Sequence, residues 1–198
     1  MTRAVRTLPL HGSREPMSYF HPRQELPERL EFDSPAILSM TDFRQVSALT
    51  CEPGASIEWA LLRMKEAGVR LLLVTDTRDA VLGLITTTDI LGERPVKLQQ
   101  ELQVRFSDIL VQDVMTPWQR LEFLAMADVM RATVADIVLT LKRVGRKHAL
   151  VIDENPCDGH TAIRGVFSAT QLARQLGEPV DPLPVASTFA EMKAVLSD

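Results

Sequence analysis

The sequence predicts an α/β (α+β) fold made of two similar βαββα units. The 21-residue stretch 56–76 recurs as 133–153, at an offset of 77 positions, and a second block, 83–91, recurs as 165–173 at an offset of 82. Composition agrees with a globular core, because 45% of the 198 residues are hydrophobic and 24% are charged. Only 5% are aromatic, so aliphatic side chains must fill most of that core.

Each copy of the first block begins as an amphipathic helix. Apolar residues fall at i, i+3, i+4 and i+7 counted from Ile57, and the same spacing starts at Val134. This period gives a helix one buried face. Both helices also carry the usual residues at their ends, a hydroxyl N-cap and a glycine just past the last turn. These residues are Ser56 and Gly68 in the first copy, and Thr133 and Gly145 in the second.

A continuous apolar run follows each helix, at 71–74 and at 149–152. Runs of this length are typical of strands that are buried on both faces. The second block, 83–91 or 165–173, is an apolar strand end that passes into a helix through a hydroxyl residue. The second copy has a hairpin loop that is five residues longer. The predicted order is therefore strand, helix, strand, strand, helix, twice.

This doubled unit resembles the CBS domain, and two in tandem resemble a Bateman module. The resemblance covers residues 36–177. It is carried by the helix–glycine–strand–aspartate runs 56–76 and 133–153, by Gly83-x-x-Thr86-x-x-Asp89 and Gly165-x-x-Ser168-x-x-Gln171, by Asp113-Val114-Met115-Thr116, and by Thr50-Cys51-Glu52-Pro53-Gly54. Three features depart from the family pattern. Gln171 stands where aspartate is usual, and residues 121–130 are additional. Residues 39–43, Ser-Met-Thr-Asp-Phe, stand in the first repeat where the family has an Asp-Val-Met entry like that at 113–115.

The resemblance implies two βαββα repeats packed with pseudo-twofold symmetry, often as a homodimer. It also implies binding of AMP, ADP, ATP or S-adenosylmethionine between the repeats, where the aspartate holds the ribose hydroxyls and the Thr or Ser contacts phosphate. Such modules regulate an attached or partner protein, are not enzymes and require no cofactor. The ligand-binding residues expected here are Thr86, Asp89, Arg70, Thr50, Ser168, Lys147 and His148.

Two interpretations of Thr86 and Asp89 stay open. A carboxylate one turn after a Thr at a helix start can accept two vicinal hydroxyls, and free backbone N–H groups there suit a phosphate. The same spacing also makes a capping box. The repeat context favours the ligand interpretation for this pair. For Ser168 and Gln171 we favour the capping box, because a neutral amide is a poorer ribose clamp, although a phosphate contact from Ser168 is compatible with it.

Arg70, Lys147 and His148 precede or begin the second strand of each repeat. In related domains this position often faces a phosphate. The alternative is that they are ordinary solvated charges at strand ends. A second function class, a ligand-free dimerisation and interaction scaffold, is suggested by Gln171 and by the segments that flank the repeats.

Other functions lack their signatures. The chain contains no GxG, GxxxxGK[ST], HExxH or GxSxG motif, and its four histidines show no metal-ligand spacing. A net charge of −4 does not suit nucleic-acid binding. No apolar run reaches membrane-spanning length and no signal peptide is evident, so we expect a cytoplasmic protein with two reduced cysteines.

The expected organisation has four parts. Residues 1–35 form an extended proline-rich arm, 36–106 the first repeat with a connecting helix, 107–178 the second repeat, and 179–198 a linker and short C-terminal helix.

Overall fold

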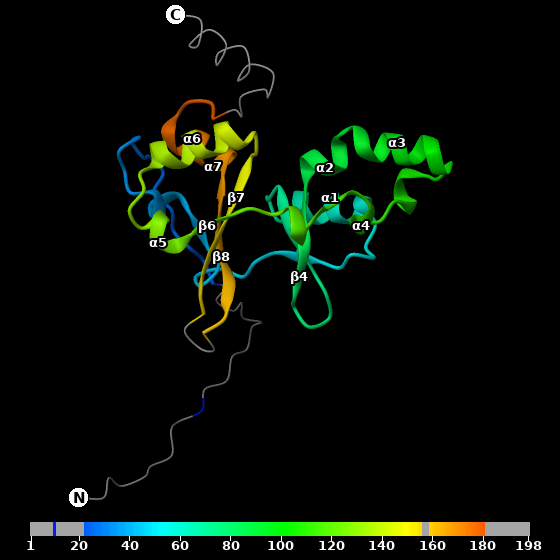
Figure 1. The fold of residues 1–198 in the computed structure, drawn as a ribbon, viewed down its shortest axis with the longest axis horizontal. Helices are drawn as coiled ribbons and strands as arrows, with labels where there is room; N and C mark the ends of the chain where they lie inside the picture. The colour runs from blue at the N-terminus through cyan, green and yellow to red at the C-terminus, as the bar shows by residue number, and fades with distance from the viewer. Residues whose placement is uncertain (1–9, 11–21, 156–158, 181–198) are drawn as a thin grey trace, which may run out of the picture.

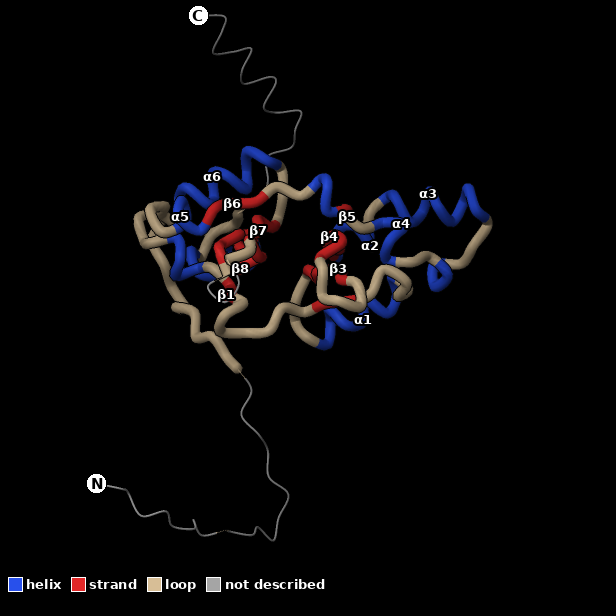
Figure 2. The backbone as a smooth tube through the Cα atoms, turned by 60° about the horizontal axis from the view of Figure 1, so that its bottom comes forward, coloured by secondary structure: helices blue, strands red, loops and turns tan. Residues whose placement is uncertain are grey.

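A computed structural model of the chain describes residues 10, 22–155 and 159–180, which form two four-stranded sheets with helices packed against them (Figure 1). Figure 2 shows the two sheets side by side, each with its own helices. Cys157 and the expected C-terminal helix lie outside the described residues. Among the described helices, none combines the length and the hydropathy that a membrane span requires.

The predicted βαββα order occurs twice, and the α/β fold class is confirmed. The first repeat consists of β2 (Thr50–Cys51), α1 (Ile57–Glu66), β3 (Leu71–Thr75), β4 (Val81–Thr86) and α2 (Thr87–Leu91). The second consists of β6 (Phe123–Ala125), α6 (Val134–Val144), β7 (His148–Glu154), β8 (Thr161–Ser168) and α7 (Ala169–Leu176), with the short α5 (Met126–Val129) after β6. The connecting helix α3 (Glu93–Leu102) follows α2.

The helix ends are those that the sequence predicts. The Ser56 hydroxyl accepts a hydrogen bond from the backbone N–H of Trp59 at 3.2 Å, and Thr133 forms a capping box with Asp136. Gly68 and Gly145 follow the helices with φ of 66° and 65°, a left-handed conformation that glycine adopts at no steric cost.

Each sheet receives its fourth strand from the segment that leads into the other repeat. The first lead segment, residues 32–42, contains the 3₁₀ helix η1 (Ala36–Ser39) and β1 (Thr41–Asp42), and β1 pairs with β8 of the second repeat. The second lead segment, residues 106–117, contains η2 (Phe106–Asp108), α4 (Val111–Val114) and β5 (Thr116–Pro117), and β5 pairs with β4 of the first repeat. A final 3₁₀ helix, η3 (Trp118–Arg120), follows β5. The strand orders are β2-β3-β4-β5 and β1-β8-β7-β6.

A glycine makes room for each exchanged strand. A Cβ on Gly83 would collide with the carbonyl oxygen of Thr116 in β5, and a Cβ on Gly165 would collide with the carbonyl oxygen of Thr41 in β1. These glycines open the two recurring blocks 83–91 and 165–173, so the recurrence of glycine at that place has a steric cause.

The lead segments also cover the starts of the long helices. The backbone N–H of Ile57 in α1 donates to the Ile109 carbonyl at 3.0 Å, while those of Val134 and Ala135 in α6 donate to the Ser34 and Phe32 carbonyls at 2.9 Å. These bonds satisfy N–H groups that a helix start leaves without intrahelical partners.

Each repeat has its own hydrophobic core, and each core includes side chains from a lead segment. Met40 packs with Phe167 and Leu172 in the second repeat, and Val111 packs with Ile57 in the first. The aliphatic composition is thereby accounted for, since Phe167 alone among the aromatic residues is fully buried in the described chain.

The described part of the N-terminal arm packs on the second repeat. The Gln24 amide donates to the Met40 carbonyl and accepts from the Asp42 N–H, at 2.9 and 2.8 Å, which completes the outer edge of β1. Further along, the Leu30 N–H donates to the Gln175 carbonyl at 3.0 Å. Residues 22–31 therefore extend the second repeat's sheet edge and helix surface.

Candidate functional site

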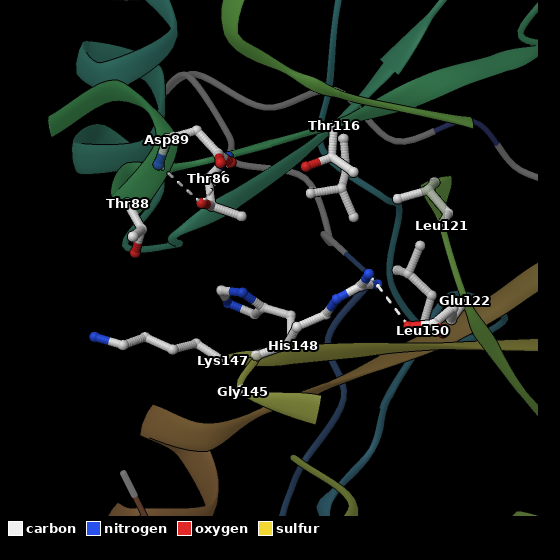
Figure 3. Close-up of a pocket in the computed structure, with 12 residues that line it drawn as sticks. Thr86, Thr88, Asp89, Thr116, Leu121, Glu122, Gly145, Lys147, His148 and Leu150 are labelled. Atoms are coloured by element: carbon white, nitrogen blue, oxygen red, sulfur yellow. Dashed lines mark hydrogen bonds and ion pairs between the residues drawn. The ribbon is translucent and has the colours of Figure 1, made fainter. Parts of the chain in front are cut away.

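Two clefts lie between the repeats and occupy equivalent places in them. The first cleft has a volume of about 260 Å³ (Figure 3). The second has a volume of about 630 Å³. In each, one repeat contributes the junction between its last strand and last helix, and the other contributes the start of its middle strand. The pseudo-twofold symmetry thus brings residues that are distant in sequence to both clefts.

The first cleft is built around the start of α2. Its polar wall consists of Thr86, Thr88, Asp89 and Thr116, its opposite wall of Glu122 and Gly145 to His148, and its apolar surface of Leu84, Leu121 and Leu150. Figure 3 shows Thr86 and Asp89 on one side and Lys147 and His148 across from them. Four of the seven predicted ligand residues, Thr86, Asp89, Lys147 and His148, are therefore brought together here.

Thr86 and Asp89 form a capping box. Asp89 Oδ2 accepts from the Thr86 N–H at 2.8 Å and from the Thr86 hydroxyl at 2.7 Å, while the Asp89 N–H donates to Thr86 Oγ1 at 3.3 Å. Asp89 Oδ1 accepts no hydrogen bond from the described residues. One carboxylate oxygen thus fixes the helix start and the other stays available to the cleft, so the two interpretations of this pair are compatible.

Charges of both signs line the first cleft. Arg146 is paired with Glu122 at 3.2 Å, and Lys147 forms no ion pair in the described chain. Burial, together with the nearby charges of Arg70 and Lys147, lowers the pKa of His148 to about 4. His148 is therefore a neutral donor and acceptor near pH 7, and not an additional positive charge.

The second cleft is built around the start of α7. It is lined by Thr41, Phe43, Val46, Ser47, Leu49 and Pro22 from the N-terminal side, by Gly68 to Leu71 and Leu73 from the first repeat, and by His148, Val166, Ser168, Thr170, Gln171 and Arg174 from the second. Two more predicted residues, Arg70 and Ser168, lie in this cleft. His148 is shared, because it contributes to the wall of both clefts.

The capping box predicted for Ser168 and Gln171 is wrong. The Ser168 side chain makes no capping hydrogen bond, and Gln171 Oε1 accepts instead from Arg174 Nη2 at 2.6 Å. A guanidinium one turn along α7 competes for the amide oxygen that a capping box would direct back to the helix start. The first N–H of α7 is satisfied in another way, by the Lys147 carbonyl at 2.9 Å.

Thr50 lies in neither cleft. It belongs to the two-residue strand β2, where its neighbour Cys51 is buried in the core and Thr50 is exposed. Adjacent residues of a strand point to opposite faces, which explains the difference. Burial raises the pKa of the Cys51 thiol to about 11, so this cysteine is a poor nucleophile.

Sequence reasoning missed Thr116 and Arg174. Thr116 was part of the recognised run 113–116, and it occupies the same place beside β4 as Thr41 does beside β8, so pairing the two lead segments would have found it. Arg174 carries no comparable signal, because its role depends on a turn of α7 facing the other repeat. Among the described residues, no group of three or more His, Cys, Asp or Glu side chains is placed to hold a metal ion.

Comparison with known proteins supports this architecture. Residues 37–95 match the family model of the CBS domain. An uncharacterized conserved protein from Pyrococcus horikoshii has a similar structure, with a TM-score of 0.52, 22% identity, and coverage of 72% of this chain and 92% of that one. A CBS-domain containing protein from Agrobacterium tumefaciens has a TM-score of 0.50 and 19% identity, with coverage of 67% of this chain and 87% of that one. A protein with CBS domains from Burkholderia ambifaria MC40-6 has a TM-score of 0.50 and 18% identity, with coverage of 65% of this chain and 81% of that one. No curated protein matches the sequence significantly.

Proposed function

Because this chain is a CBS-domain protein with the fold of a Bateman module, we propose that it is a regulatory module that binds an adenosine-containing ligand in the first cleft. AMP, ADP, ATP and S-adenosylmethionine are the candidate ligands. The protein itself would catalyse no reaction and would act on an attached or partner protein.

The observation that carries this proposal is the carboxylate of Asp89. Its Oδ2 is held by Thr86, so the side chain is oriented before any ligand arrives, and its Oδ1 is not used by the described residues. A fixed carboxylate oxygen beside an apolar surface can accept hydrogen bonds from the two hydroxyls of a ribose. Leu84, Leu121 and Leu150 would then contact the base.

Donors for a phosphate lie in the same cleft. The hydroxyls of Thr88 and Thr116 line it, and the exposed Lys147 adds a positive charge from the second repeat. The Glu122 carboxylate is neutralised by Arg146 and so does not repel an anion at full strength. The cleft offers both signs of charge, which also suits S-adenosylmethionine.

Regulation would follow from the origin of these residues. Asp89 and Thr86 belong to the first repeat, whereas Lys147 and His148 belong to the second, so a bound ligand contacts both. A ligand shifts an equilibrium only by its differential affinity for two arrangements. A ligand that bridges the repeats favours the arrangement in which they are close, and a partner protein can respond to that arrangement.

Calorimetric titration of adenosine and AMP into the wild type and Asp89→Asn tests the proposal. The amide keeps an oxygen for the Thr86 cap but loses the charge, so we expect both ligands to bind about tenfold more weakly, the usual loss for a charge-assisted hydrogen bond. Asp136→Asn is the matched control, because Thr133 and Asp136 form the same capping box outside both clefts. Absence of binding to the wild type, or equal losses in the two variants, would contradict the proposal.

A dimerisation scaffold is the second candidate, and a specific observation favours it. Trp59 and Leu62 on α1 and Leu139 on α6 are 47%, 53% and 66% exposed. Leu62 and Leu139 occupy equivalent positions of the two repeats, as the 77-residue offset shows. Large exposed apolar side chains on matching helices suit contact with a second copy of the chain.

Sedimentation velocity tests this contact. We expect the wild type to sediment as a dimer and Leu62→Glu to sediment as a monomer, because a buried carboxylate in an apolar interface is costly. A wild type that stays monomeric at high concentration contradicts the dimer. A dimer that binds neither adenosine nor AMP favours the scaffold over the sensor.

A further inference from the structure

We infer that the ion pair between Glu122 and Arg146 reads the polar edge of the ligand's base, and that it selects adenine over other purines. The inference rests on the proposed function, because it takes Asp89 as the ribose-binding carboxylate of the first cleft. It adds two specificity-determining side chains that no sequence motif of the chain singles out.

The pair lies on the side of the first cleft opposite Asp89. Glu122 and Arg146 both line this cleft, together with the leucines of its apolar surface. In Figure 3, Glu122 lies beside Leu150 and across the cleft from Asp89. A nucleoside whose ribose is bound by Asp89 and whose base packs on the leucines therefore directs the edge of its base towards Glu122 and Arg146.

Both side chains keep polar groups for a ligand. Arg146 Nη2 lies 3.2 Å from Glu122 Oε2 and also donates to the Arg120 carbonyl at 3.3 Å. The described residues make no hydrogen bond to Glu122 Oε1, or to Nε and Nη1 of Arg146. The ion pair thus holds a charged acceptor and charged donors side by side, and it orients them before a base arrives.

Adenine offers the complementary pattern of groups. Its exocyclic amino group is a donor, and the adjacent ring nitrogen N1 is a bare acceptor. The Glu122 carboxylate can accept from the amino group while the Arg146 guanidinium donates to N1. Hypoxanthine and guanine carry a carbonyl oxygen and a ring N–H at these two places, so the same placement would set acceptor against acceptor and donor against donor.

The equivalent positions in the second cleft are apolar. Strands β2 and β6 pair with β3 and β7 in the same register, so Leu49, just before β2, is equivalent to Glu122, just before β6. Val69 is equivalent to Arg146 through the 77-residue offset, and both Leu49 and Val69 line the second cleft. An apolar pair therefore suffices at this place in the fold. The Glu122 and Arg146 side chains are 73% and 40% exposed, and so exposed an ion pair adds little to stability. Recognition of a polar group explains the charged pair better than packing does.

Calorimetric titration of adenosine and purine riboside tests the role of Glu122, because purine riboside is adenosine without the amino group. We expect the wild type to bind adenosine about tenfold more tightly, the usual effect of a charge-assisted hydrogen bond. Glu122→Leu, which introduces the residue found at the equivalent position, should weaken adenosine binding about tenfold and leave purine riboside binding unchanged. Asp128→Leu is the matched control, since it breaks an exposed ion pair with Arg131 outside both clefts and should bind both nucleosides as the wild type does.

Arg146 is tested in the same way with 1-deazaadenosine, in which a C–H group replaces N1. The wild type should bind this analogue about tenfold more weakly than adenosine, and Arg146→Val should bind the two equally. Each comparison is between two nucleosides on one variant. A loss of stability alone would therefore change both affinities alike and leave their ratio intact.

The inference and the proposed function fail in distinguishable ways. Asp89→Asn should weaken adenosine and purine riboside alike, because they share the ribose, and should keep their ratio. If adenosine does not bind the wild type, the proposed function is contradicted and the inference with it. The inference alone is overturned if Asp89→Asn weakens adenosine binding but the wild type binds purine riboside or inosine as tightly as adenosine, or if Glu122→Leu keeps the preference for adenosine.

Discussion

Arg164 shows at the residue scale how one side chain fixes a strand of only two residues. Its Nε and Nη2 donate to the two carboxylate oxygens of Asp42 in β1 at 2.7 and 2.8 Å, and its Nη1 donates to Asp153 in β7 at 2.9 Å. The Asp42 side chain is buried and the Arg164 side chain is partly buried, with 7% and 15% of their surfaces exposed. The pair joins the first lead segment to the second repeat's sheet, where a buried charge without its partner would be costly.

The pH dependence of stability should reveal this pair. The hydrogen bond from Arg164 lowers the pKa of Asp42 from 3.8 to about 2. A carboxyl group whose pKa is lower in the folded state stabilises the fold above its unfolded pKa, and this contribution is lost as the pH falls from about 4 to 2. We expect it to be about 2 kcal/mol in denaturant unfolding experiments. Asp42→Asn should be less stable at neutral pH and should lose less stability on acidification, and an unchanged pH profile would refute this assignment.

Glycine controls the exchanged strands at the scale of elements. A Cβ on Gly83 or Gly165 meets backbone that cannot move without displacing β5 or β1. We expect Gly83→Ala and Gly165→Ala each to lower the free energy of unfolding by about 1–3 kcal/mol, as overpacking does. Gly54→Ala is the matched control, since a Cβ there meets nothing within 4 Å. Equal unfolding free energies for the three variants would show that the close approach is unimportant.

Gly83→Ala should also affect the first cleft, because the displaced strand carries Thr116. Gly165→Ala should instead affect the second cleft, which Thr41 lines. Ligand titrations of the two variants therefore separate the clefts by a change made in the strands and not in the binding residues.

Secondary-structure elements could be predicted from the sequence where the apolar residues repeat over several turns or where a capping residue marks an end. The helices α1 and α6 have four apolar positions at helical spacing and clear caps, and both were found with their ends. Strands β1 and β5 have two residues each, which carry no period, and their partners lie in the other repeat. Because tertiary packing sets this pairing, no local sequence pattern indicates the exchange of lead segments.

The candidate site was predictable in the same uneven way. Thr86, Asp89, Lys147 and His148 meet in the first cleft because each occupies a recurring position of the repeat. The sequence shows that Gln171 departs from the repeat, but it does not show the hydrogen bond from Arg174 to Gln171. The amide of Gln171 could equally have formed a capping box with Ser168, and only the packing of α7 decides between these partners. The link between Asp42 and Arg164 spans 122 residues and left no local pattern.

At the scale of the whole molecule, the exchanged lead segments make one unit of two repeats. Met40 of the first lead segment completes the core of the second repeat, and Val111 of the second lead segment completes the core of the first. Each core therefore depends on the segment that leads into the other repeat. The clefts lie at the junction that this exchange creates. Pseudo-symmetry places them alike, while a single difference between the repeats gives the first cleft the carboxylate of Asp89 and the second cleft the amide of Gln171.

A structure of crystals grown in the presence of adenosine tests most directly the central claim that the first cleft binds an adenosine-containing ligand. It shows where the ligand lies and which repeats it contacts. We expect adenosine in the first cleft, with both ribose hydroxyls bound to Asp89 and with contacts to residues of both repeats, including His148. Adenosine that contacts one repeat alone, or a first cleft that stays empty when the ligand is present above its dissociation constant, would contradict it.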